Sequence, residues 1–223
     1  MRFAVLVFPG SNCDHDAYFV IRNILNSSVD FVWHKEHDLS NYDAIIIPGG
    51  FSYGDYLRAG AIARFSPIME SVIKEANDGK PVIGICNGFQ ILVESGLLPG
   101  TLMTNKKIKF LSQNVTLQTE TTNSIFTRNL DNGQHLTMPI AHKQGNYFAD
   151  ENTLKKLQDN DQIAFTYAAI NGGNPNGSVL DIAGIINEKR NVLGMMPHPE
   201  RASENILNSK DGIAIFESMI GAS

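Results

Sequence analysis

Short, wholly apolar runs separated by helix-length stretches are the feature that most limits the fold of this chain. Residues 3–8 and 44–47 carry only apolar side chains, and a proline and glycine follow each run. Strands that are apolar on both faces are typical of a sheet covered by helices on each side. Alternation of such strands with amphipathic helices predicts βαβ units. We therefore expect an α/β fold with a doubly wound, mostly parallel sheet.

The first hundred residues divide into predicted strands and helices of this kind. Apolar residues recur at helical spacing over 17–25, and Ser11, Asn12 or Asp14 could serve as the N-cap of that helix. A second helix is expected from Ser66, with Pro67 in its first turn. The sequence thus predicts strands at 3–8, 29–33, 44–47 and 81–85, and helices at 17–25, from 66 and at 87–94.

The second half of the chain has a different pattern. Apolar and polar residues alternate over 115–119 and 163–168, which predicts antiparallel strands and hairpins added to the parallel sheet. A last strand is expected at 192–196 and a final helix from Ser209 or Asp211. Because we find no repeat and no long linker, we expect one domain over residues 1–223.

Composition excludes several classes of protein. The 18 Lys and Arg residues against 23 Asp and Glu give a net charge of −5, which argues against a nucleic-acid partner. The apolar runs are far shorter than the roughly 20 residues of a membrane-spanning helix. Two cysteines cannot build a disulfide framework, and the N-terminus has no secretory signal pattern. We therefore expect a cytoplasmic protein without a membrane partner.

One of the two cysteines lies where a strand turns into a helix. In Gly84-Ile-Cys86-Asn-Gly88, small residues flank the thiol on both sides, as in a nucleophile elbow. The N-terminus of the following helix favours the thiolate, which is the nucleophilic form. The alternative is a small buried core residue. Cys13 also precedes a helix but has no flanking glycines, so we interpret it as structural.

A cysteine nucleophile needs a base and a group that orients that base. His198 and Glu200 are two residues apart in Pro197-His-Pro-Glu200, a proline-stiffened segment after a predicted strand, so their side chains point the same way. Active sites of parallel sheets lie at the carboxyl ends of the strands, where Cys86 is also expected. A stiff surface turn is the alternative interpretation.

The oxyanion formed by nucleophilic attack needs fixed hydrogen-bond donors. Asn87 supplies the backbone N–H next to the nucleophile, which is the usual donor in an elbow. Gly50, in Pro48-Gly-Gly50 at the end of a neighbouring strand, is the second candidate donor. A purely structural turn at 48–50 would explain the same residues.

The order of these motifs resembles the class I, or triad, glutamine amidotransferases, whose fold is flavodoxin-like. That resemblance rests on Pro48-Gly-Gly50, on Gly84-x-Cys86-x-Gly88-x-Gln90 and on Pro197-His-Pro-Glu200. The longer stretches PGSNCD at 9–14, PGGFSYGDYLRAG at 48–60 and MPHPER at 196–201 are similar to the glutaminase subunits of phosphoribosylformylglycinamidine synthase. The resemblance covers the whole chain.

The resemblance implies an enzyme that hydrolyses glutamine to glutamate. Cys86 would form a γ-glutamyl thioester, His198 would act as acid and base, and Glu200 would orient His198. Gln90 matches a position that helps to hold glutamine, and His142 and Gly145 belong to a stretch that lines the glutamine pocket. His142 taken alone is more often a structural histidine. The ammonia would pass to an ATP-dependent synthase, which converts formylglycinamide ribonucleotide to formylglycinamidine ribonucleotide in purine biosynthesis.

We expect no cofactor on this chain, because it lacks a phosphate-binding glycine motif. ATP and Mg²⁺ are expected on the synthase partner, and the complex would include a small accessory subunit. No metal site is expected, and His15, His34 and His37 are interpreted as solvated. Arg58, Arg64 and Arg201 are interpreted as surface ion pairs. We also expect weak turnover without the synthase.

Three other functions remain open at the level of sequence. One is a glutaminase for another pathway, such as guanylate, pyridoxal phosphate or imidazole synthesis, which would share the triad. Another is a peptidase, deglycase or chaperone with a cysteine elbow on the same sheet, which would not need Pro-His-Pro-Glu. The last is a regulatory subunit without activity, although Cys86, His198 and Glu200 are all present.

Overall fold

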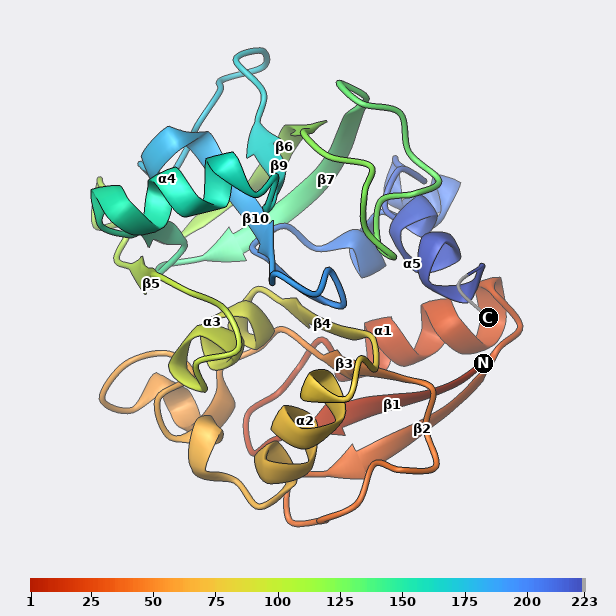
Figure 1. The fold of residues 1–223 in the computed structure, drawn as a ribbon. Coiled ribbons are helices and arrows are strands. Elements are labelled where there is room, and N and C mark those ends of the chain that lie inside the picture. The colour runs from red at the N-terminus through yellow and green to blue at the C-terminus, as the bar shows by residue number, and fades with distance from the viewer. Residues whose placement is uncertain (222–223) are drawn as a thin grey trace.

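A single nine-stranded sheet forms the centre of the molecule. The computed structural model describes residues 1–221, and its sheet has the strand order β2-β1-β3-β4-β11-β10-β9-β6-β7. In Figure 1 the early strands β1 to β4 lie in the lower half and the later strands β6, β7, β9 and β10 lie in the upper half. β5 and β8 form a separate antiparallel pair. The strands are β1 Arg2–Val7, β2 Ser28–Trp33, β3 Ala44–Ile47, β4 Val82–Ile85, β5 Thr101–Met103, β6 Leu111–Thr119, β7 His135–His142, β8 Asn146–Phe148, β9 Ile163–Tyr167, β10 Ile182–Ile186 and β11 Val192–Met195.

Five α-helices pack around this sheet. They are α1 Asp14–Phe19, α2 Ile68–Asn77, α3 Asn87–Glu94, α4 Glu151–Asp159 and α5 Ile213–Ile220. Among residues 1–221, each helix is too short or too polar to cross a bilayer.

The parallel part of the sheet matches the prediction from the apolar runs. β1 pairs in parallel with β2 and β3, and β4 pairs in parallel with β3 and β11. All four residues of β3, β4 and β11 are buried, because neighbouring strands and helices enclose them on both faces. The doubly wound α/β fold with a mostly parallel sheet is thereby confirmed.

The antiparallel strands extend that sheet at one edge. β10 pairs antiparallel with β11 and with β9, and β6 pairs antiparallel with β9 and β7. The sequence predicted strands within β6 and β9 and missed α4 entirely. Asp150 caps α4 by accepting a hydrogen bond from Thr153 N at 2.8 Å, and Leu157 is its one buried residue. The helix is polar overall, so it lacks the apolar content by which the other helices were predicted.

The start of α1 differs from the expected helix at 17–25. α1 begins at Asp14, and a π-helical segment over Val20–Ile24 continues it. Cys13 occupies the N-cap position without a side-chain capping bond, whereas Ser11, Asn12 and Asp14 were the expected caps. The thiol is a poor acceptor, and Asn12 instead accepts a hydrogen bond from Cys13 Sγ at 3.2 Å. The N-cap residue of α1, Cys13, therefore bonds Asn12 instead of a backbone N–H of the helix.

Strand order places four loops at one edge of the sheet. The chain leaves β1 for β2 on one side and returns to β3 on the other, so the carboxyl ends of β1 and β3 flank a topological switch point. A bridge between Ser11 and Gly50 joins the loops that follow these two strands. Cys86 follows β4 and His198 follows β11, which are the next strands in the sheet. The predicted site residues therefore come together at the crevice where α/β sheets bind ligands.

Candidate active site

Cys86 has a strained backbone between β4 and α3. Its φ of 52° and ψ of −103° lie outside the regions that side chains normally adopt, and the residue is 5% exposed. The Sγ atom lies 3.7 Å from the carbonyl oxygen of Ala141 in β7. Strain of this kind persists only where the surrounding structure imposes it, and it is concentrated at functional sites.

The two flanking glycines are required by close packing of the elbow. A Cβ on Gly88 would overlap the carbonyl oxygen of Ile47, and a Cβ on Gly84 would lie 2.6 Å from the carbonyl oxygen of Gly88. The helix N-terminus therefore sits directly against the ends of β3 and β4. The small residues expected on both sides of Cys86 have the physical role that the elbow pattern predicted.

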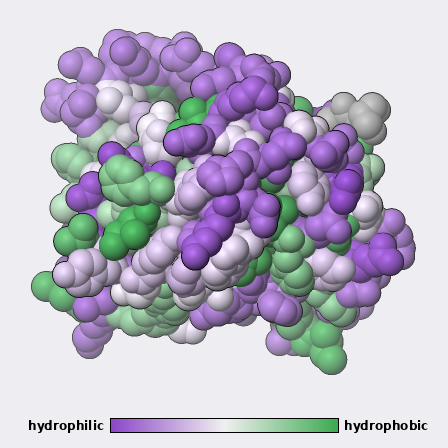
Figure 2. Space-filling model, turned by 90° about the horizontal axis from the view of Figure 1, so that it is seen from below, coloured by the Kyte–Doolittle hydropathy of each residue, from purple (hydrophilic) through white to green (hydrophobic). Residues whose placement is uncertain are grey.

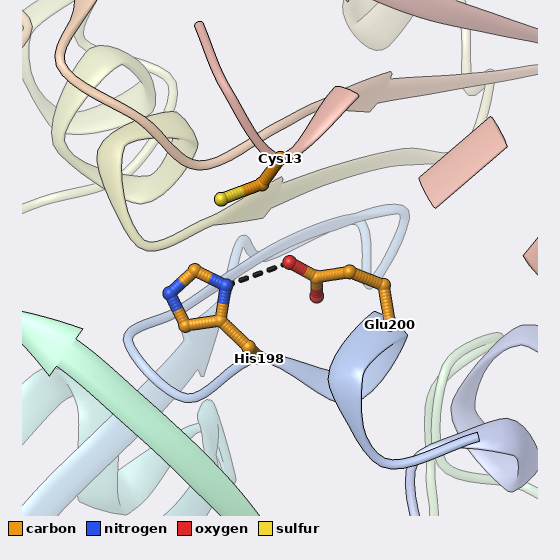
Figure 3. Close-up of side chains that lie close together, drawn as sticks. All are labelled: Cys13, His198 and Glu200. Atoms are coloured by element: carbon orange, nitrogen blue, oxygen red, sulfur yellow. Dashed lines mark hydrogen bonds and ion pairs between the residues drawn. The ribbon is translucent and has the colours of Figure 1, made fainter. Parts of the chain in front are cut away.

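His198 and Glu200 form a buried hydrogen-bonded pair. Nδ1 of His198 lies 2.6 Å from Oε1 of Glu200, and the two side chains are 2% and 0% exposed. A carboxylate only accepts hydrogen bonds, so Nδ1 is the donor. Figure 3 shows the two side chains facing each other from consecutive parts of one turn. The two side chains therefore point the same way, as the sequence predicted.

The charges around His198 favour its protonated form. Burial by itself lowers the pKa of His198, but the negative charges of Glu200 and Cys86 outweigh burial and hold that pKa well above its usual value. Within residues 1–221, Nε2 of His198 has no hydrogen-bond partner. The imidazole thus has one nitrogen fixed by Glu200 and the other free for reaction.

The two candidate oxyanion loops are tied to each other. Oδ1 of Asn87 accepts a hydrogen bond from Ser52 N at 3.1 Å, which links the elbow to the loop after β3. Gly50 has a φ of 140°, and a Cβ there would lie 2.7 Å from Asn12 N, so only glycine fits. Gly50 lines a small pocket together with His198. Gly50 and the first residue of α3 therefore border the same site.

Gln90 is held by the site rather than projecting freely into it. Its Oε1 accepts a hydrogen bond from Asn87 Nδ2 at 2.8 Å, and its Nε2 donates to the carbonyl oxygen of Gln144 at 2.6 Å. Gln90 therefore connects the elbow to the segment that contains His142 and Gly145. Its structural position is compatible with holding that segment in place.

His142 is a buried neutral base beside this segment. Burial, with the charge of His198 second, lowers the pKa of His142 to about 3. Nδ1 lies 3.1 Å from Oδ1 of Asn105, whose Nδ2 donates to two carbonyl oxygens, so Oδ1 is the acceptor and Nδ1 carries the proton. Nε2 is consequently an acceptor, and it has no partner among the described residues. A side chain on Gly145 would collide with the His142 ring.

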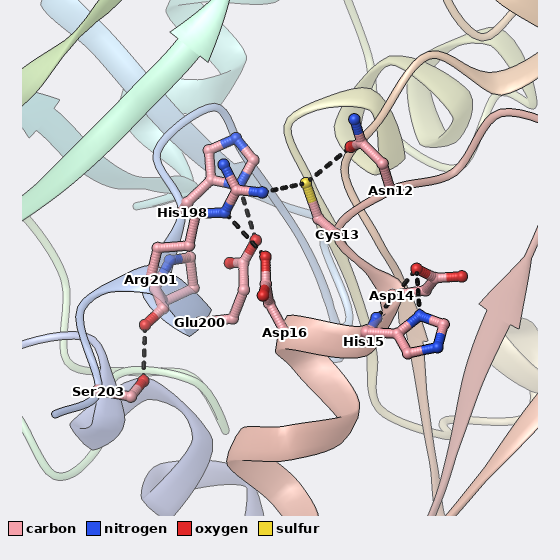
Figure 4. A network of polar contacts seen from close by, with 10 residues as sticks. Asn12, Cys13, Asp14, His15, Asp16, His198, Glu200, Arg201 and Ser203 are labelled. Carbon is pink, nitrogen blue, oxygen red and sulfur yellow. Dashed lines mark hydrogen bonds and ion pairs between the residues drawn. The ribbon is translucent and has the colours of Figure 1, made fainter. Parts of the chain in front are cut away.

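The sequence interpretation missed the position of Cys13. It is 3% exposed, as a structural cysteine would be, but its Sγ is near His198 and Glu200 (Figure 3). Arg201 Nη2 donates to that sulfur at 3.3 Å, and Asp16 holds Arg201 Nε at 2.9 Å (Figure 4). The crossover of the chain from β1 to β3 is the signal that could have located Cys13 in the site.

Arg201 is accordingly more than a surface ion pair, whereas Arg58 fits that expectation and Arg64 lies on the surface but bonds a backbone carbonyl instead of a carboxylate. Arg58 makes a bidentate pair with Glu94 at 2.6 and 2.7 Å, and Arg64 donates to the carbonyl oxygen of Glu94 at 3.0 Å. Both arginines are exposed. Neither contributes to the crevice beside His198.

The expectation that three histidines are solvated was wrong for His34. It is 6% exposed, and its Nδ1 lies 2.9 Å from the hydroxyl of Tyr53. His34 also stacks against Phe8, which explains its burial. The structure places His15 and His37 on the surface. The three residues do not converge.

Comparisons with known proteins agree with this geometry. Residues 1–217 match the family model of the CobB/CobQ-like glutamine amidotransferase domain. Phosphoribosylformylglycinamidine synthase subunit PurQ of Koribacter versatilis (strain Ellin345) is 58% identical over 227 residues, covering 100% of this chain and 98% of that protein.

Solved structures show the same fold. A chain in the structure of PurLQS from Thermotoga maritima superposes with a TM-score of 0.88 at 41% identity, over 99% of this chain and 97% of that one. Another glutamine amidotransferase from Thermotoga maritima has a TM-score of 0.59 at 15% identity, covering 98% and 90%, and supports the fold alone. The chain belongs to the glutamine amidotransferases, in the group of PurQ subunits of phosphoribosylformylglycinamidine synthase.

Proposed function

We propose that this chain hydrolyses glutamine through a thioester on Cys86. The thiolate attacks the side-chain amide carbon, and the backbone N–H groups of Asn87 and Gly50 stabilise the oxyanion. His198 gives a proton to the departing ammonia, and the C–N bond breaks. His198 then takes a proton from water, which attacks the thioester and releases glutamate.

One observation carries this proposal. The buried hydrogen bond between His198 Nδ1 and Glu200 Oε1 leaves Nε2 without a partner, and Cys86 in its strained elbow is close enough to raise the pKa of His198. Glu200 thereby fixes the tautomer that a general acid and base needs. The unpartnered Nε2 of His142 suits an N–H group of the substrate, and Gln90 and Gly145 hold the segment that presents His142.

The ammonia is proposed to serve an ATP-dependent synthase that makes formylglycinamidine ribonucleotide. Support comes from the relative named as part of that synthase and from the PurLQS structure, whose name joins Q to two further components, L and S. The larger partner would be the synthase and the smaller one an accessory protein. ATP and Mg²⁺ would bind to the synthase, and this chain would work in the cytoplasm.

Exposed apolar side chains in the segment after Gly50 support a docking surface for the synthase there. Leu57 and Phe65 are 80% and 73% exposed in the segment that follows Gly50. Figure 2 shows hydrophobic residues at the left edge of a mostly hydrophilic face, on the side where Figure 1 places this segment. A partner bound there would contact the loop that holds Gly50, which explains why turnover would be weak without it.

Glutamate and ammonia release from glutamine would test the proposal. We expect slow turnover by the chain alone, a large increase with a cognate synthase, and no turnover by Cys86→Ala under either condition. Full turnover without the synthase would contradict the gating. Absence of turnover by folded, reduced protein with the synthase would contradict the glutaminase function and favour a regulatory role.

A further inference from the structure

A second thiol faces the His198–Glu200 pair, and the proposed hydrolysis does not use it. The Sγ of Cys13, a ring nitrogen of His198 and a carboxylate oxygen of Glu200 all lie within 4.8 Å of one another. Packing fixes this arrangement, since a Cβ on Gly49 would lie 2.8 Å from His198 Cε1 and 3.1 Å from Cys13 Sγ. The three groups come from two turns that are far apart in sequence, as Figure 3 shows.

Two atoms of this group are buried without a partner. Oε2 of Glu200 and Nε2 of His198 make no hydrogen bond within residues 1–221, and the residues are 2% and 1% exposed. Buried polar atoms are nearly always satisfied, so an unpartnered carboxylate oxygen beside a thiol indicates a missing ligand. Nε2 lies on the side of the ring away from Glu200, so a cation shared by the three groups would take the place of the proton between His198 Nδ1 and Glu200, with Cys13 Sγ as the third ligand.

We propose that Cys13, His198 and Glu200 form an inhibitory binding site for a thiophilic divalent cation of the zinc type. One thiolate, one imidazole and one carboxylate are the ligand types that Zn²⁺ prefers. Zinc bonds of about 2.0 to 2.3 Å place neighbouring ligand atoms roughly 3 to 4 Å apart. The three ligand atoms lie within 4.8 Å of one another, which is close to that spacing. The adjoining pocket of about 200 Å³ has room for water as the fourth ligand.

Binding exchanges protons for the metal and transfers no electrons. The hydrated cation loses water, Cys13 loses its thiol proton, and His198 gives up the Nδ1 proton together with its hydrogen bond to Glu200, which the metal bonds replace. Arg201 releases its hydrogen bond to Cys13 Sγ and keeps its pair with Asp16. A nearby guanidinium opposes the cation, so the site is expected to bind more weakly than a dedicated structural zinc site.

The bound cation would stop glutamine hydrolysis by occupying His198. This consequence rests on the proposed function, because it requires His198 to be the acid and base. The binding itself depends only on the three side chains. The two parts can therefore be tested separately.

The binding test uses the fact that the chain contains two cysteines. In Cys86→Ala, Cys13 is the one remaining thiol, and Co²⁺ is the probe because cobalt–thiolate bonds absorb in the near ultraviolet. We expect a charge-transfer band that titrates with Co²⁺ and is removed by added Zn²⁺. Cys86→Ala combined with Cys13→Ala, or with Cys13→Ser, should lack the band while keeping the circular dichroism of the parent. No band in Cys86→Ala, or the same band in both double variants, would overturn the site.

The affinity test uses Zn²⁺ alone and the competition with Co²⁺. Cys13→Ser in the Cys86→Ala background should weaken zinc binding by at least about tenfold. Arg201→Gln in that background should tighten it, because a positive charge is removed from beside the sulfur. Unchanged affinity in Cys13→Ser, or weaker affinity in Arg201→Gln, would contradict the proposed ligand set.

The inhibition test uses the full protein with its synthase and measures glutamate release against Zn²⁺ concentration. Cys13→Ser should need at least about tenfold more zinc for half inhibition than the parent. Equal sensitivity would show that the metal acts through Cys86 and would overturn inhibition through Cys13. Absence of glutamine hydrolysis would contradict the proposed function. The cobalt band would still show whether Cys13 binds the metal.

Discussion

Two strand-to-helix turns carry the two thiols, and they differ in backbone rather than in burial. Cys86 and Cys13 are 5% and 3% exposed, so exposure does not separate them. Cys86 has φ 52° and ψ −103°, whereas Cys13 has the relaxed values −106° and 7°. The strained turn therefore carries the proposed nucleophile, and the relaxed turn places a second thiol next to the proposed base.

The environments of the two sulfurs differ accordingly. Cys86 lies at the start of an eight-residue helix and contacts a carbonyl oxygen of β7. Cys13 lies before a six-residue α-helix and is held by Arg201 and Asn12. Both thiols add to the raised pKa of His198, after the larger effect of Glu200. The base therefore has a thiol on either turn, and the proposed chemistry uses one of them.

Removal of each thiol in turn is expected to give the largest difference in activity between the two turns. Cys86→Ala should lower glutamine hydrolysis by at least roughly 10⁴-fold, because the covalent route is lost. Cys13→Ala should lower it by at most about tenfold, since nucleophile, base and orienting carboxylate all remain. Steady-state glutamate release with the synthase present measures both. Equal losses of activity in the two variants would contradict the assignment of Cys86, and not Cys13, as the nucleophile.

The orienting carboxylate gives the next largest effect. Glu200→Gln should lower kcat by roughly 10³- to 10⁴-fold, because an amide can donate to Nδ1 and favour the wrong tautomer. Asp16→Asn is the matched control, since it makes the same change in the carboxylate that holds Arg201 on the Cys13 side. A much smaller loss is expected in Asp16→Asn. Similar losses in the two variants would indicate a general charge effect rather than orientation of His198.

Equivalent positions two residues after each thiol should differ in their effect on stability. Gly88→Ala should cost about 3 kcal/mol of unfolding free energy, because its Cβ would overlap the carbonyl oxygen of Ile47. His15→Ala, at the same place after Cys13, should change stability by less than about 0.5 kcal/mol because the ring is 83% exposed. Urea denaturation followed by circular dichroism compares them. A tolerated Gly88→Ala would show that the elbow does not need its tight packing.

The sequence predicted the elbow turn much better than the Cys13 turn, for a physical reason. The apolar run at 82–85, the two glycines and the apolar face of α3 are local signals, and α3 begins and ends where expected, at Asn87 and Glu94. The approach of Cys13 to His198 depends on strand order, which brings together two turns from opposite ends of the chain. No local pattern records such a contact.

The same contrast explains the other differences between prediction and structure. β3 was predicted to the residue, because both of its faces are buried and its signal is continuous. α4 was missed because its sequence is mostly polar, and His34 was misjudged because its partner Tyr53 lies in a different loop. The alternative interpretations of the elbow as a peptidase or a chaperone were settled by family membership rather than by any single residue.

The two strands that precede the thiols, β1 and β4, also begin differently. β4 is preceded by Lys80, whose Nζ lies 2.7 Å from Oε2 of Glu75, and the side chains are only 13% and 9% exposed. β1 begins with Arg2, which pairs with Asp30 at 2.8 Å, and these side chains are 48% and 43% exposed. Water and salt screen the exposed pair more strongly. The strand of the strained turn therefore has the better-anchored start.

This difference gives the smallest predicted effect, and it depends on pH. The hydrogen bond from Lys80 is the main cause of the lowered pKa of Glu75. A carboxyl with a lowered folded pKa stabilises the protein above its unfolded pKa, and this contribution is lost as pH falls through the folded value. Glu75→Gln should therefore cost about 1 kcal/mol at pH 7 and progressively less in acid, whereas Asp30→Asn should have little effect at either pH. Urea unfolding of both variants at neutral and acidic pH measures this, and a pH-independent cost for Glu75→Gln would show that packing, not charge, anchors the start of β4.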